Sequence, residues 1–156
     1  AEMLTLAEGL ELYHVDHSDY PIPYRHPAAP LTWHYNVPNS LTTPIEYISN
    51  VEAFFDPFST FRSMDPSDPR YQFHRYGLIS VSYSEATNLP PEWGVLSDAA
   101  RSRFKEIIGH WRTDGYGPST RSGGWIFGPS YDPTNGTIST GSIYRNQKDA
   151  EGIQYL

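Results

Sequence analysis

Apolar side chains follow a helical period over the first twenty residues of the chain. Four of them share one helix face, because they recur at spacings of three and four residues: Met3, Leu6, Leu10 and Tyr13. Leu4, Ala7 and Leu12 are expected to widen this face. Pro21 ends the pattern, since a proline disfavours helical backbone at the residue before it. The pattern predicts a helix over 1–20 whose apolar face packs on a sheet or on another chain.

This helix has a clear end but no clear start. No Ser, Thr, Asp or Asn precedes the apolar run to accept the free backbone N–H groups of a first turn, because the chain opens directly with Ala1 and Glu2. An apolar-faced helix without a cap is typical of the second part of a longer helix. We therefore expect the native gene to encode further residues before Ala1.

Prolines dominate the next segment and exclude a continuous helix there. Residues 31–37 alternate apolar and polar side chains, which predicts a short edge strand or an extended loop. Thr43, Pro44 and Glu46 then match a capping box, with a hydroxyl that can cap and a proline at the first helical position. This arrangement predicts a short helix from Pro44 to about Asn50.

Two further elements are predicted in the middle of the chain. Alternation from Tyr71 to Tyr83 predicts a strand, which Arg75 and Gly77 interrupt, so a bulge or two shorter strands also fit. Ser97 is expected to cap a second helix and Gly109 to stop it. The apolar residues at helical spacing in this second helix are Ala100, Phe104, Ile107, Ile108 and Trp111.

The C-terminal part is rich in turn residues. A glycine-rich loop is predicted over 112–124 and a short strand over 125–127. Asn135-Gly136 is the pair that favours a type I′ turn, so a hairpin is predicted around it, within 131–143. The polar stretch 145–156 is expected to be a mobile tail.

Composition narrows the class of protein. A chain of 156 residues suits one domain, 1–156, and the elements predict the α+β class: a long N-terminal helix on a small antiparallel sheet, a second short helix and long loops. The absence of cysteine excludes disulfides and Cys-ligated metals. A net charge of −7 without a basic cluster argues against nucleic acid as a partner. No apolar run reaches the about 18 residues that span a bilayer.

Candidate chemistry is sparse. His14 and His17 lie one helical turn apart and could begin a zinc site, which would need a third ligand from elsewhere. The alternative is a polar helix end at which histidine complements the helix dipole. The other histidines stand among aromatic residues: His26, His34, His74 and His110. No nucleophile elbow, phosphate loop or dinucleotide fingerprint occurs, so no catalytic residue is expected.

Three oxygen-bearing residues close to the predicted hairpin turn could hold a hard cation such as calcium: Asp132, Asn135 and Thr137. The same spacing also matches an ordinary turn that is stabilised by local hydrogen bonds. We expect the turn, without a metal or other cofactor, and calcium is the alternative.

Three segments, in this order, resemble the soluble part of type IV pilin-like proteins, specifically the G-like pseudopilins of bacterial type II secretion. The first is 10–21, LELYHVDHSDYP, which is similar to the family's helix end with its "YP" corner. The second is LTTPIEYI at 41–48 with DPF at 56–58. The third is YDPTNGT at 131–137 with TGSI at 140–143, similar to the family's "YDPTNGT…GDI" ending.

The resemblance implies a structural subunit of a filament, without enzymatic activity. It implies a basic leader and an apolar membrane-spanning segment before Ala1. A prepilin peptidase would cleave the leader, and the inner-membrane assembly machinery would assemble the subunit. Its partners would be copies of itself and other pilin-like subunits. Its location would be the bacterial cell envelope, anchored in the inner membrane before assembly, with the globular domain periplasmic or extracellular.

The chain also departs from that family. Many G-like pseudopilins bind calcium near a "GPD" segment, and Gly117-Pro118-Ser119 has serine in place of the acid, which leaves calcium in doubt. The helix predicted over 97–111 resembles an insertion relative to the simplest members of that family. Two other functions stay open: an extracellular module that binds carbohydrate or another ligand through exposed Tyr and Trp, and a metalloenzyme built on His14, His17 and a third ligand.

Overall fold

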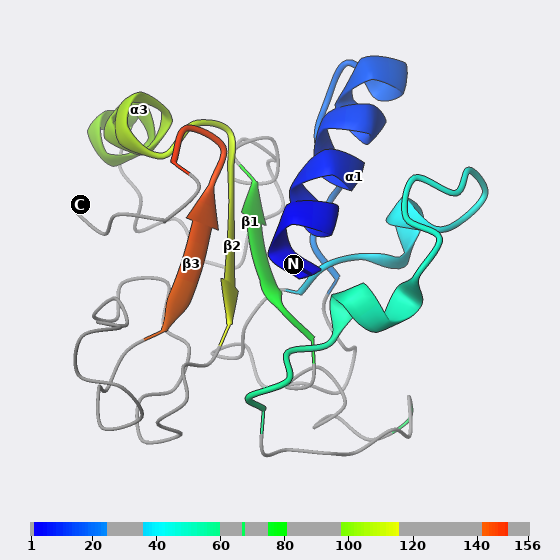
Figure 1. Ribbon diagram of the computed structural model, residues 1–156. Coiled ribbons are helices and arrows are strands. Elements are labelled where there is room, and N and C mark those ends of the chain that lie inside the picture. Colours follow the sequence, from blue (N-terminus) through cyan, green and yellow to red (C-terminus); the bar gives the residue numbers. More distant parts are fainter. Residues whose placement is uncertain are drawn as a thin grey trace.

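The structure, a computed structural model, describes residues 2–24, 36–59, 67, 75–80, 98–115 and 142–149. Its elements in chain order are α1 (Glu2–His17), the 3₁₀ turns η1 (Asn39–Leu41) and η2 (Val51–Phe54), β1 (Gly77–Ser80), α3 (Asp98–Ile107), β2 (Trp111–Gly115) and β3 (Ile143–Asn146). A helix beside a small antiparallel sheet agrees with the α+β class that the sequence predicts. Figure 1 shows α1 next to β1 and α3 near the opposite, β3 side of the sheet.

The strands form an antiparallel sheet in the order β1-β2-β3. Leu78 of β1 lies opposite Thr113 of β2, which in turn lies opposite Arg145 of β3. Single bridges from Gly77 to Asn36 and from Asn36 to Tyr24 extend the pairing past β1. β1 falls inside the strand predicted over 71–83, of which 71–74 and 81–83 lie outside the described residues.

The first helix forms as predicted and ends at His17. Ser18 has a positive φ of 56°, and its N–H donates to the carbonyl of His14 at 2.8 Å, which closes the last turn. Leu4 and Leu12 do not widen the buried face, since both are exposed. The helix turns by about 100° per residue, which places these two leucines away from Leu6 and Leu10.

The core lies between α1, the turns that follow it, and one face of the sheet. Leu6 and Leu10 contribute from the helix, and Leu78 and Trp111 contribute from β1 and β2. Gly9 lets Ile48 approach the helix backbone, because a Cβ at position 9 would overlap the Ile48 side chain. The other fully buried apolar side chains of this cluster are Val37, Leu41, Ile48 and Phe54.

The short helix predicted from Pro44 to about Asn50 is absent, and bends occupy this stretch. The Thr43 hydroxyl donates to the carbonyl of Asn39 at 3.3 Å, whereas a capping hydroxyl would accept from a helical N–H. The N–H groups of Tyr47 and Ile48 both donate to the Leu41 carbonyl at 3.0 Å. The helix prediction was wrong, because the N–H groups of Tyr47 and Ile48 pair with the last residue of the η1 turn instead of with a helix.

The prediction of a loop over 112–124 was also wrong for its first residues, since Trp111–Gly115 is the central strand β2. Its sequence, WRTDG, shows no alternation of apolar and polar residues, yet all five residues are buried. β3 likewise continues to Asn146, into the stretch that was expected to be a mobile tail. The strand predicted over 125–127 and the hairpin turn at Asn135-Gly136 lie outside the described residues.

The second helix is confirmed as α3, from Asp98 to Ile107. Gly109 follows it with a φ of 99°, the left-handed conformation that glycine adopts without strain, so its predicted role as a stop holds. Trp111 lies in β2 rather than on the helix, because the chain turns at Gly109 before reaching it.

Leu10 and Leu12 provide a matched pair on one helix. Leu10→Ala removes a fully buried side chain and is expected to lower the free energy of unfolding by about 2–5 kcal/mol. Leu12→Ala, at a residue that is 53% exposed, should change it by less than about 0.5 kcal/mol. Urea titrations of both variants measure the difference. Equal losses would show that α1 docks through a different face.

Candidate interaction surface

The outer face of α1 is unusually apolar. Leu4 is 48% exposed, Leu12 is 53% exposed and Val15 is 76% exposed, and Glu8 lies between them on the same face. At about 100° per residue these four side chains fall within about 80° of the helix circumference. A helix on the surface of a monomer normally places polar residues opposite its core face. Exposed apolar side chains that line up in this way indicate a contact surface.

The inner face of α1 is fixed to the core. Leu6 and Leu10 are completely buried, whereas Met3 and Tyr13 are partly buried and pack against the same cluster. These are the four residues that the helical period singles out. The helix therefore has two apolar faces, one buried in the protein and one open.

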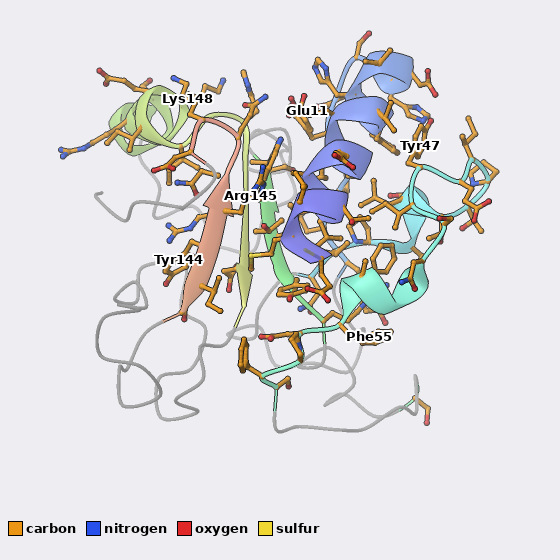
Figure 2. The ribbon with its side chains drawn as sticks, in the orientation of Figure 1. Glu11, Tyr47, Phe55, Tyr144, Arg145 and Lys148 are labelled. Carbon is orange, nitrogen blue, oxygen red and sulfur yellow. The ribbon has the colours of Figure 1, made fainter. Side chains whose placement is uncertain are left out.

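Glu11 connects the helix to the distant sheet. Glu11 is labelled on α1 in Figure 2. Its carboxylate accepts a hydrogen bond from the Trp111 indole N–H at 2.8 Å, from the Tyr20 hydroxyl at 3.1 Å and from the Gln147 amide at 3.1 Å. The Gln147 side-chain amide also donates to the Tyr20 hydroxyl at 2.7 Å. The side-chain oxygen of Gln147, Oε1, accepts from the backbone N–H of His110 at 2.7 Å. Burial and the negative charge of Glu11 raise the pKa of Tyr20 well above its ordinary value.

The histidines of α1 stack on tyrosines. His14 lies against Tyr20 with ring centroids 4.5 Å apart, and His110 lies 5.9 Å from the same ring. His17 stacks on Tyr13 at 4.1 Å, and its Nε2 is 3.2 Å from the Tyr47 hydroxyl. That hydroxyl donates to Asp16 at 2.8 Å and so joins the loop around residue 47 to the helix end.

No third metal ligand joins His14 and His17 in the part of the chain that the structure describes. Among these residues there is no group of three or more His, Cys, Asp or Glu side chains that could hold a metal ion. The calcium candidates lie outside the described residues, as do three of the other histidines: Asp132, Asn135, Thr137, His26, His34 and His74. The tyrosine contacts account for the two α1 histidines as structural residues.

A buried charged pair lies on the other face of the sheet. Arg112 and Asp114 alternate with Trp111 along β2 and therefore point away from the core that contains α1. The Arg112 guanidinium lies 3.6 Å from the centre of the Tyr144 ring. Asp114 lies over Gly77, where a Cβ would overlap its carboxylate.

Burial dominates the electrostatics of this pair. It raises the pKa of Asp114 to about 6, although the charge of Arg112 acts to lower it. It also lowers the pKa of Arg112, against the opposing effect of Asp114. Both side chains are at least 95% buried, at 0% and 5% exposed, so they meet the protein interior rather than a substrate. We assign them a structural role.

Sequence reasoning did not single out Glu11, which bonds to the sheet, or Val15, which is exposed on the outer face. A strict helical projection would have placed Val15 beside Leu4 on the outer face. No local signal could have identified the partners of Glu11, since Trp111 and Gln147 follow it by 100 and 136 residues.

No protein-family model matches the chain, and neither a curated protein nor a solved structure matches it. Across the described ranges, no helix is both long and apolar enough to cross a membrane. Inference about function therefore rests on the geometry of α1 and on the sequence motifs.

The contribution of the Glu11 network can be measured by comparing two glutamates one turn apart. Glu11→Ala leaves three donors without their charged acceptor, so we expect a loss of about 2 kcal/mol or more in the free energy of unfolding. Glu8→Ala, at an exposed position, should change it by less than about 0.5 kcal/mol. Urea titration at neutral pH separates the two. Similar, small effects would show that the network does not hold the helix.

Asp114 gives a prediction about pH. Because its pKa is about 6 in the folded protein and about 3.9 in an unfolded chain, the folded state binds the proton more tightly. The contribution of Asp114 to stability therefore falls as the pH rises from about 4 to about 6. The check is the difference in unfolding free energy between wild type and Asp114→Asn, measured from pH 4 to pH 7 in urea. A difference that grows in favour of wild type as pH rises would mean that attraction to Arg112 outweighs burial.

Proposed function

We propose that this chain is a structural, non-catalytic subunit of a type II secretion or type IV pilus-like filament. The observation that carries the proposal is the pair of apolar faces on α1. Leu6 and Leu10 hold the inner face in the core, and Leu12 and Val15 leave the outer face open to other molecules. A helix that packs in two opposite directions serves a subunit that must join its own domain to its neighbours.

The sequence motifs support the same proposal. The first motif, 10–21, covers the end of α1 and the corner at Pro21, where the helix meets the rest of the domain. The second, 41–48 with 56–58, supplies Leu41 and Ile48, which are buried against the helix. In this reading α1 continues N-terminally into a membrane-spanning segment, and the partners are like subunits and the inner-membrane assembly machinery.

The other two functions gain no support from the described residues. A carbohydrate-binding module would present a platform of exposed aromatic rings, whereas the large apolar side chains exposed here are aliphatic with the exception of Phe58. A histidine metalloenzyme would bring a third ligand to His14 and His17, and those two rings stack on tyrosines instead.

The proposal is tested with the full-length gene product. We expect the sequence before Ala1 to encode a short basic leader and an apolar segment of about 20 residues. Expressed with a prepilin peptidase and a pilus assembly system, the protein should lose its leader, as judged by mass spectrometry, and enter filaments visible by electron microscopy. An ordinary soluble domain before Ala1, or an intact leader, would contradict the proposal.

A pair of charged substitutions tests the outer face of α1. Val15→Asp should reduce filament yield by roughly tenfold or more, since a loss of about 1.4 kcal/mol per contact has that effect. Ile22→Asp is the matched control, because Ile22 is 65% exposed and lies beyond the helix. Both variants should keep the melting temperature of the isolated domain. Normal filament yield from Val15→Asp would show that the outer face of α1 is not part of the interface between subunits.

A further inference from the structure

Charge is distributed unequally over the described surface. Residues 2–24 contain no Lys or Arg, and their acidic residues are Glu2, Glu8, Glu11, Asp16 and Asp19. Elsewhere in the described ranges, Arg103 and Lys148 have exposed side chains. Arg103 lies on α3, and the Lys148 ammonium donates to the Glu106 carbonyl at the C-terminal end of the same helix, at 2.7 Å.

These charges restrict how the outer face of α1 can be covered. Glu8 lies among Leu4, Leu12 and Val15, so any molecule that covers the three apolar side chains also covers the carboxylate. A covered charge needs a cationic partner, because its desolvation is otherwise uncompensated. Two α1 helices packed on each other would place acidic residues together and supply no cation. A symmetric contact between two copies of α1 is therefore disfavoured.

We infer that the outer face of α1 on one copy binds the α3 end of a second copy, with Glu8 facing the cations at Arg103 and Lys148. The inference deepens the proposed filament function and rests on it. The two surfaces are separated within one molecule, since α1 lies beside β1 and α3 lies near β3 (Figure 1). Lys148 marks the α3 end in Figure 2. α3 also carries the exposed Glu106, so the surface offers two cationic points rather than a uniform positive field.

This contact uses different surfaces on the two copies, and such a contact continues from copy to copy instead of closing into a dimer. Such a contact gives a ring where its rotation closes and an open chain with a single direction where it does not, and a filament requires the open chain. The long aliphatic stems of Arg103 and Lys148 can cover Leu12 and Val15 while their charged ends reach Glu8.

Cross-linking tests the pairing directly, because the chain contains no cysteine. Thr5→Cys places a thiol beside the outer face of α1, and Ser102→Cys places one next to Arg103, with all charges retained. Under copper-phenanthroline oxidation, two thiols lose two electrons and two protons to form one disulfide. A mixture of the two variants should give a cross-linked dimer, and the double variant should give a ladder of longer chains.

Charge reversal identifies the contact. Glu8→Lys in the Thr5→Cys chain should lower the yield of mixed dimer at least fivefold, and Arg103→Glu in the Ser102→Cys chain should restore it. Glu46→Lys, at an exposed acid outside α1, is the control and should leave the yield unchanged. Raising the salt concentration should also lower the yield, because exposed charges are screened.

Three results would overturn the inference. The first is a yield of Thr5→Cys dimers equal to that of the mixed dimer, and the second is a mixed-dimer yield that charge reversal does not alter. The third is the absence of any cross-link at millimolar protein concentration. The filament assay with the full-length protein is scored separately. Filaments without this cross-link would support the filament function and contradict the α1–α3 contact. The cross-link without filaments would support the contact and contradict the filament function.

Discussion

The orientation of the first helix depends on one carboxylate. Apolar contacts through Leu6 and Leu10 drive α1 onto the core, but such contacts have no direction and tolerate rotation and sliding. Glu11 removes that freedom, because it accepts hydrogen bonds from Tyr20, Trp111 and Gln147, which belong to three separate parts of the chain. The outer face of α1 is presented at a defined angle because the side of the helix next to it is fixed in this way.

The sequence is most informative where a periodic pattern coincides with the local chemistry. α1 was predictable because its apolar period runs from Met3 to Tyr13, and the end of α3 was predictable because Gly109 adopts a conformation that other residues avoid. In both cases the deciding interactions lie within a few residues of each other.

The sequence is least informative where distant residues decide the structure. β2 could not be predicted, since Arg112 and Asp114 are buried in it through contact with strands remote in sequence. The helix predicted after Thr43 does not form, because the N–H groups of Tyr47 and Ile48 donate to the Leu41 carbonyl instead. The two roles of α1 were only half predictable, because a helical period identifies the buried face but assigns no partner to Glu11.

A helix with two apolar faces has an unusual relation to the rest of its domain. An ordinary amphipathic helix has no apolar face left in water once its single apolar face is covered. α1 differs, because folding covers Leu6 and Leu10 but leaves Leu12 and Val15 in water. The fold therefore leaves one apolar face of α1 in water, and the proposed filament contact would cover it.

The span of the Glu11 network also sets the order in which the domain is completed during synthesis. The helix is made before the other described elements, whereas one of its hydrogen-bond donors, Gln147, is made 136 residues later. Until that residue has been made, the Glu11 carboxylate lacks one of its three donors. A chain that stops before β3 would hold this carboxylate through Tyr20 and Trp111 alone. Only a chain that includes Gln147 completes the network that fixes the angle of α1.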